Sequence, residues 1–118
     1  MTPAAAKKKG MDFQKEIRDL ILKHFTELTA RDVKSTSSGA DGEDILLSER
    51  AYEALNHIVI ECKSLNKLET HNVYAAIKQC QGHGEGKLHA AFMRTNHKGP
   101  LVVLEAEEFI KFMRSLTK

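Results

Sequence analysis

Apolar side chains recur at three- and four-residue steps near the start of the chain. The steps begin after Asp12 and continue to Leu28, so the apolar positions fall on one side of a helix. A stripe of this kind predicts a helix that packs against a core. Its members are Phe13, Ile17, Leu20, Ile21, His24, Phe25 and Leu28.

Short apolar runs farther along the chain predict strands. Residues 45–47 and 58–60 are rich in branched side chains, and residues 88–93 and 101–104 follow after a gap. The segment between the first two runs, residues 48–57, fits a short helical turn or the tip of a wide hairpin. The pattern leaves these two alternatives open.

Two further helices are predicted in the second half of the chain. One has Thr70 as a plausible N-cap and ends at a glycine-rich turn, and the other starts near Glu105. A helix between strands favours the α/β class, with a mixed central sheet flanked by helices. The apolar faces expected to be buried are Val73, Tyr74, Ile77 and Cys80 on the first helix, and Phe109, Ile110, Met113 and Leu116 on the second.

Composition is consistent with one globular domain. With 118 residues, of which 42% are hydrophobic, the chain can bury a core without disulfides, and Cys62 and Cys80 are expected to be reduced core thiols. We assign residues 11–118 to this domain and residues 1–10, which contain three consecutive lysines, to a flexible basic arm. The chain has neither an apolar run long enough to span a membrane nor a secretory signal at its start, so a cytoplasmic location is expected.

The segment that ends the second predicted strand contains the most informative chemistry. Alternation along the strand places Glu61 and Lys63 on one side and points Cys62 into the core. Asp44 opens the preceding strand, so pairing of the two strands would bring its carboxylate near Glu61. Two carboxylates at close range repel each other unless a cation lies between them, which predicts a divalent metal site.

Oxygen ligands favour Mg²⁺, with Mn²⁺ as a substitute, and such ions hold a water that can attack phosphorus. Lys63 would orient or activate that water. A plainer alternative is a surface ion pair between Glu61 and Lys63 beside a solvated Asp44. The serine- and glycine-rich segment of residues 33–44, which predicts a loop that can approach a ligand closely, favours the metal site.

These residues resemble the PD-(D/E)xK nuclease superfamily, most of all the archaeal-type Holliday junction resolvases and related phage nucleases. The resemblance runs from Asp12 to the end of the chain, although Glu43 stands where the name-giving motif has proline. It implies a restriction-endonuclease-like fold and a homodimer that cleaves junction DNA in recombination or repair, located with the cellular DNA. Either Asp41 or Asp44 fits the motif's aspartate, and we prefer Asp44 because a strand fixes its position.

The resemblance also implies roles for residues outside the Asp44, Glu61 and Lys63 set. Glu16 and the Cys62 backbone carbonyl would complete the metal ligands, and Ser38 would contact the scissile phosphate. Gln79 and Gln81 match a helix glutamine of some members only weakly. Positive side chains that could frame the site and bind DNA phosphates are Lys67, Lys78, Arg94, His97 and Lys98, although each is also an ordinary surface cation.

Two other functions remain open at this stage. The same chemistry would serve a restriction-like, nicking or repair endonuclease that acts on other DNA, because the core of the fold does not determine the substrate. A DNA-binding module of the same fold that has lost cleavage is a second alternative, against which the complete acid, acid and lysine set argues.

Overall fold

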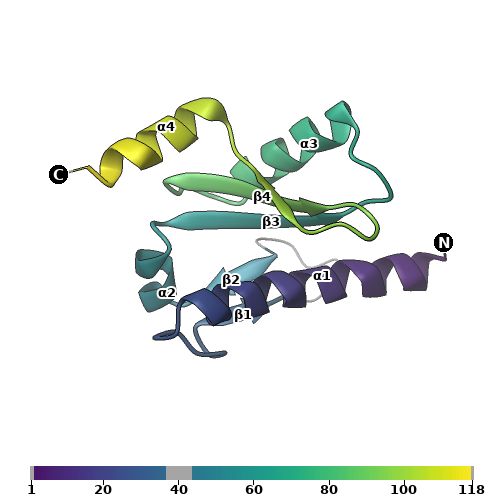
Figure 1. Cartoon of the computed structure of the whole chain (residues 1–118), viewed down its shortest axis with the longest axis horizontal. Helices are drawn as coiled ribbons and strands as arrows, with labels where there is room; N and C mark the ends of the chain where they lie inside the picture. Colours follow the sequence, from purple (N-terminus) through teal and green to yellow (C-terminus); the bar gives the residue numbers. More distant parts are fainter. Residues whose placement is uncertain (1, 37–43, 118) are drawn as a thin grey trace.

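The computed structural model of the chain describes residues 2–36 and 44–117, which contain four helices and five strands (Figure 1). The helices are α1 (Pro3–His24), α2 (Glu49–Ala54), α3 (Thr70–Gln81) and α4 (Ala106–Ser115), and the strands are β1 (Val33–Ser35), β2 (Ile45–Leu47), β3 (Ile58–Ser64), β4 (Leu88–Arg94) and β5 (Leu101–Val103). The predicted α/β class is therefore confirmed.

The strands form two sheets. In the larger one, β3 pairs in parallel with β4, and β4 pairs with β5 in the antiparallel sense. The smaller one is the antiparallel pair of β1 and β2. Helix α1 and the β1–β2 pair lie on one side of the larger sheet, and α3 and α4 lie on the other (Figure 1). The larger sheet is thus a small mixed sheet flanked by helices.

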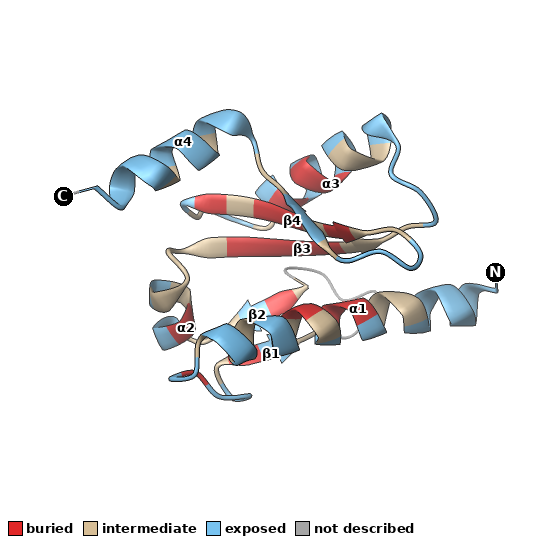
Figure 2. Cartoon of the chain, viewed as in Figure 1, coloured by how far each residue is buried: buried red, intermediate tan, exposed pale blue. Residues whose placement is uncertain are grey.

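Each face of the sheet packs against its own core. Ile60 and Cys62 point toward α1, where they meet Phe13 and Ile17. On the opposite face, Ala91 and Met93 of β4 pack with residues of α3. Figure 2 shows these buried surfaces along α1, β3, β4 and α3. The prediction that Cys62 points into the core is confirmed.

Helix α1 begins earlier than the hydrophobic pattern indicates. Residues 3–10, for which composition predicts a flexible arm, form its first turns. Thr2 caps the helix by accepting a hydrogen bond from the Ala5 amide, and Pro3 occupies the first helical position, where its missing N–H costs nothing. The alanines and lysines that follow are strong helix formers, so this exposed segment is helical without a core to pack against.

Strand β1 lies inside the segment predicted to be a loop. Val33 is fully buried and pairs with Leu47, and Ser35 pairs with Ile45. Three residues carry too little pattern to predict a strand, and it is the antiparallel pairing with β2 that makes them one. The ambiguous segment before β3 is the helix α2, which Ser48 caps by accepting a hydrogen bond from the Ala51 amide.

Helix α4 does not bury the face predicted for it. Phe109, Ile110, Met113 and Leu116 are 43%, 62%, 50% and 62% exposed, and none of the helix residues is buried. Figure 2 shows α4 as largely exposed along its length. The prediction of a buried side was wrong because amphipathic spacing identifies an apolar face without identifying what covers it. Tyr74 of α3 is likewise 72% exposed.

No helix in the described ranges, residues 2–36 and 44–117, is long and apolar enough to cross a membrane.

Candidate active site

Asp44 lies at the free edge of β3. Its Oδ2 accepts a hydrogen bond of 2.7 Å from the backbone amide of Cys62. This proximity was predicted from direct pairing of β2 with β3, but in the described part of the chain β2 pairs only with β1. The carboxylate reaches β3 from just before β2 instead, so the predicted proximity is present through a side chain and a backbone amide.

Glu61 is a buried acid on the neighbouring position of β3. The residue is only 1% exposed, and its Oε2 lies 3.0 Å from Nε2 of His83, whose side chain is itself mostly buried. His83 lies just beyond the end of α3, on the sheet face that Glu61 occupies. A buried carboxylate needs such a partner because desolvation disfavours its charged form.

The protonation of Glu61 reflects this environment. Burial raises the pKa of Glu61 to about 7, the contact with His83 opposes that rise, and the nearby Asp44 carboxylate adds to it. Lys63 lowers the pKa of Glu61 through its charge. Two acids this close, with one of them holding a proton near neutral pH, form the arrangement in which a cation can replace the proton.

The backbone of β3 supplies a further oxygen at the same edge. In an extended strand the N–H and C=O of one residue point to the same side, and the Cys62 N–H points to Asp44. The Cys62 carbonyl therefore lies on the Asp44 side of β3, where it would have to lie to act as a metal ligand together with Asp44. Burial raises the pKa of the Cys62 thiol, so its sulfur stays neutral in the core.

Lys63 is only partly exposed and follows Glu61 on the same face of β3. Asp44, Glu61 and Lys63 are thus brought together, with both acids in direct contact with protein groups. The described residues contain no set of three His, Cys, Asp or Glu side chains placed to share one metal ion. Two carboxylates and a carbonyl are the oxygen donors near this edge of β3.

Glu16 has a different partner in this structure. Its carboxylate forms an ion pair with Arg94, at the end of β4, and the Arg94 guanidinium also lies over the Phe13 ring, 4.8 Å from its centre. Ser38 and Asp41 fall within residues 37–43, outside the described residues. The metal-ligand role of Glu16 and the phosphate contact of Ser38 therefore remain predictions drawn from the resemblance.

Most of the predicted phosphate-binding side chains gather where β3 and β4 end. Arg94 is the last residue of β4, and Lys67, His97 and Lys98 are exposed on the two loops that follow these strands. Lys9 of α1 reaches the same loops, because its Nζ donates hydrogen bonds to Asn66 and Asn96. Lys78 is exposed in the last turn of α3.

Of the two weakly predicted glutamines, Gln81 donates a hydrogen bond to Glu105 at the start of α4, and Gln79 is exposed. The Gln81 contact does not involve Glu61. The described contacts thus give these glutamines no place beside the acids.

His83 is the site residue that sequence reasoning missed. The sequence offers one signal for it, because Cys80 belongs to the apolar face predicted for α3 and His83 comes three residues later. In the structure Cys80 packs against β3 by donating from Sγ to the Val59 carbonyl. Side chains three apart at a helix end lie on the same side, so His83 is directed at β3 as well. The glycines around it suggested a turn and hid this spacing.

Comparisons with protein-family models, with curated proteins and with solved structures each return no match for this chain.

Proposed function

We propose that this protein is a magnesium-dependent endodeoxyribonuclease of the PD-(D/E)xK type, with a restriction-endonuclease-like fold. The observation that supports it best is the meeting of two acids at one edge of β3, with Asp44 on the Cys62 amide and Glu61 buried beside it. Lys63 follows on the same face. Junction DNA, cleaved by a homodimer, is the substrate that the sequence resemblance favours.

The donor set fits a hard cation. Asp44, Glu61 and the Cys62 carbonyl offer oxygen atoms only, and the proton that Glu61 retains near neutral pH is the positive charge a cation would replace. When bound, the ion supplies a Lewis acid and a water with a lowered pKa. By resemblance, Glu16 is a further ligand and Mn²⁺ substitutes for Mg²⁺.

The side chains around the acids have separate roles in charge stabilisation, positioning and DNA binding. Lys63 holds a positive charge next to Glu61 and offsets the negative charge that develops on phosphorus. His83 acts as a positioning residue, because its Nε2 lies 3.0 Å from Oε2 of Glu61 and this contact fixes the direction of the carboxyl group. The cations beyond β3 and β4 bind DNA phosphates without reading sequence.

Cleavage of a mobile four-way junction in Mg²⁺ tests this site. We expect Glu61→Gln and Lys63→Ala each to lower the rate by at least about a hundredfold, because each removes a group that acts on the reacting phosphate. Glu27→Gln, which neutralises an exposed acid far along the chain from β3, is the matched control. Cleavage that persists undiminished in both site variants would contradict the proposed site.

A DNA-binding module without cleavage is the second candidate. The observation in its favour is that both acids already have protein partners, Cys62 for Asp44 and His83 for Glu61. Junction, flap, nicked and linear duplex DNA assayed side by side separate these functions. If no DNA is cut in Mg²⁺ or Mn²⁺ while DNA binding persists, the protein is a DNA-binding module without nuclease activity. If duplex DNA is cut without preference for junctions, the protein is a restriction-like or repair enzyme.

A further inference from the structure

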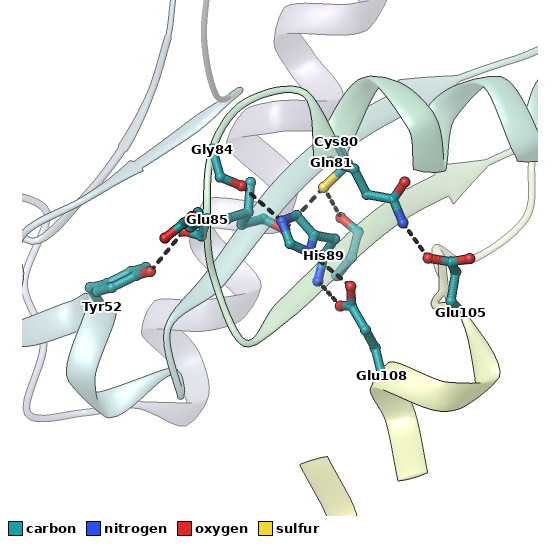
Figure 3. Close-up of polar contacts among 10 residues, drawn as sticks. Tyr52, Cys80, Gln81, Gly84, Glu85, His89, Glu105 and Glu108 are labelled. Atoms are coloured by element: carbon teal, nitrogen blue, oxygen red, sulfur yellow. Dashed lines mark hydrogen bonds and ion pairs between the residues drawn. The ribbon is translucent and has the colours of Figure 1, made fainter. Parts of the chain in front are cut away.

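Helix α4 meets the rest of the protein through Glu105, Glu108 and the half-buried Phe112. Glu108 accepts a hydrogen bond of 2.6 Å from the His89 amide and lies 2.9 Å from Nδ1 of the same residue. At the start of the helix, Glu105 accepts a hydrogen bond from Gln81 of α3. Figure 3 shows Glu105 and Glu108 directed at these partners. These contacts fix which side of α4 faces the sheet.

Another side of α4 is apolar and faces solvent. Residues 109, 110, 113 and 116 recur at helical spacing and lie on one stripe, and this set is defined here as the α4 stripe. Its members, Phe109, Ile110, Met113 and Leu116, are all among the exposed large hydrophobic side chains. The hydrophobic effect favours covering such a stripe, and within the described part of the chain its members stay exposed.

The size of the stripe fits a protein interface. Its four side chains expose on the order of 400 Å² of apolar surface, which is within the range of the largest patch on a typical monomer and often functional. A standard interface buries roughly 800 Å² per partner, a little over half of it apolar. The α4 stripe supplies most of the apolar area that one partner needs.

The charges beside the stripe indicate which partner fits. Glu107, which forms an exposed ion pair with Lys111 of the same helix, and Arg114 lie two turns apart along the same flank of the stripe, with Ile110 close to their midpoint. When a second α4 packs antiparallel about a two-fold axis near Ile110, Glu107 of each copy meets Arg114 of the other. A surface that is complementary to itself in this way is what a symmetric dimer requires.

We propose that two copies of this chain pair through the α4 stripe, with their α4 helices antiparallel. The inference depends on the α4 surface and not on the proposed nuclease activity. It names the surface through which the chain self-associates, while the chemistry at β3 is tested separately by cleavage.

Sedimentation of the full chain over about 1–100 μM tests the pairing. We expect a dimer, and we expect Ile110→Glu to weaken the dimer by at least about a hundredfold because it places two charges at the axis. Leu46→Glu is the matched control, since Leu46 is 51% exposed on β2 and belongs to the other side of the molecule. A wild-type monomer at all concentrations, or an Ile110→Glu dimer as tight as wild type, would overturn the proposal.

A charge exchange tests the antiparallel arrangement. Glu107→Lys and Arg114→Glu should each weaken the dimer roughly tenfold, because like charges then face each other, and the double variant should recover most of the loss. Thermal unfolding checks that each variant is folded. Recovery supports the antiparallel pair, and a double variant as weak as the two single variants would contradict it.

Discussion

Helices α1 and α4 both carry apolar side chains at helical spacing, but only α1 buries members of this set. Phe13 and Ile17 of α1 are completely buried against the sheet, while α4 buries none of its residues and exposes its whole apolar stripe. The two helices meet the sheet with different side chains: α1 presents aromatic and branched ones, whereas α4 presents Glu108, which contacts His89, and the half-buried Phe112. Apolar periodicity therefore identifies an apolar face of a helix but not which side of the helix meets the sheet.

Replacing one isoleucine by alanine in each helix tests this difference between α1 and α4 most directly. Ile17→Ala should lower the free energy of unfolding by about 2–5 kcal/mol, because it leaves a cavity in the core. Ile110→Ala should change it by no more than about 0.5 kcal/mol in dilute, monomeric protein, because the side chain is exposed. Urea unfolding measures both. Equal losses would show that the α4 stripe is covered within one chain.

The contact between Glu108 of α4 and His89 should depend on pH, which gives a second test of how α4 is held. Burial lowers the pKa of His89, but its hydrogen bonds with the Gly84 carbonyl and with Glu108 outweigh burial and raise the pKa above its ordinary 6.5. A histidine whose folded pKa is raised adds stability that is fully present below pH 6.5 and is lost as the pH rises through the folded pKa. The contact therefore holds α4 best in mildly acidic solution.

Glu108→Gln should remove this effect. We expect it to cost about 1–2 kcal/mol of unfolding free energy near pH 6, and less as the pH rises, because the ion pair is then already lost in the wild type. Urea unfolding at several pH values measures the difference. Glu107→Gln, which neutralises the exposed neighbouring acid, is the control and should show no such trend. A cost that stays constant with pH would contradict a charged His89.

The smallest expected effect concerns the exposed beginning of α1. Gly10→Ala should stabilise the protein by about 0.5–1 kcal/mol, because alanine favours the helix and nothing lies within 4 Å of the added carbon. Thermal and urea unfolding measure this gain. If residues 3–10 were the arm that composition predicts, the substitution would change nothing, so an unaltered stability would contradict the helical start.

Much of the site around β3 could be predicted from the sequence. Strand alternation placed Glu61 and Lys63 on one face and Cys62 on the other, because the period of a strand is local and needs no knowledge of the fold. The proximity of Asp44 to β3 was also predicted, although through strand pairing that the described residues do not show. Local patterns were thus informative where one strand determines the geometry.

The remaining features depend on contacts between segments far apart in the chain. His83 meets Glu61 only because α3, which connects the parallel strands β3 and β4, packs on the face of the sheet that carries Glu61. Residues 33–35 form the strand β1 only by pairing with β2. The pairing of Glu16 with Arg94 joins residues 78 positions apart. Apart from the three-residue step from Cys80 to His83, the spacing within each segment gives no sign of these contacts, which explains why the sequence did not predict them.

Asp44 also has a consequence for how β3 meets other chains. Among residues 2–36 and 44–117, no strand pairs with β3 on the side away from β4, and open amides on such an edge invite strands of other molecules to add to the sheet. The Asp44 carboxylate occupies the Cys62 amide on that edge and brings a negative charge to it. The side chain for which we propose metal binding therefore also leaves one amide fewer on this edge for a strand of another molecule to pair with.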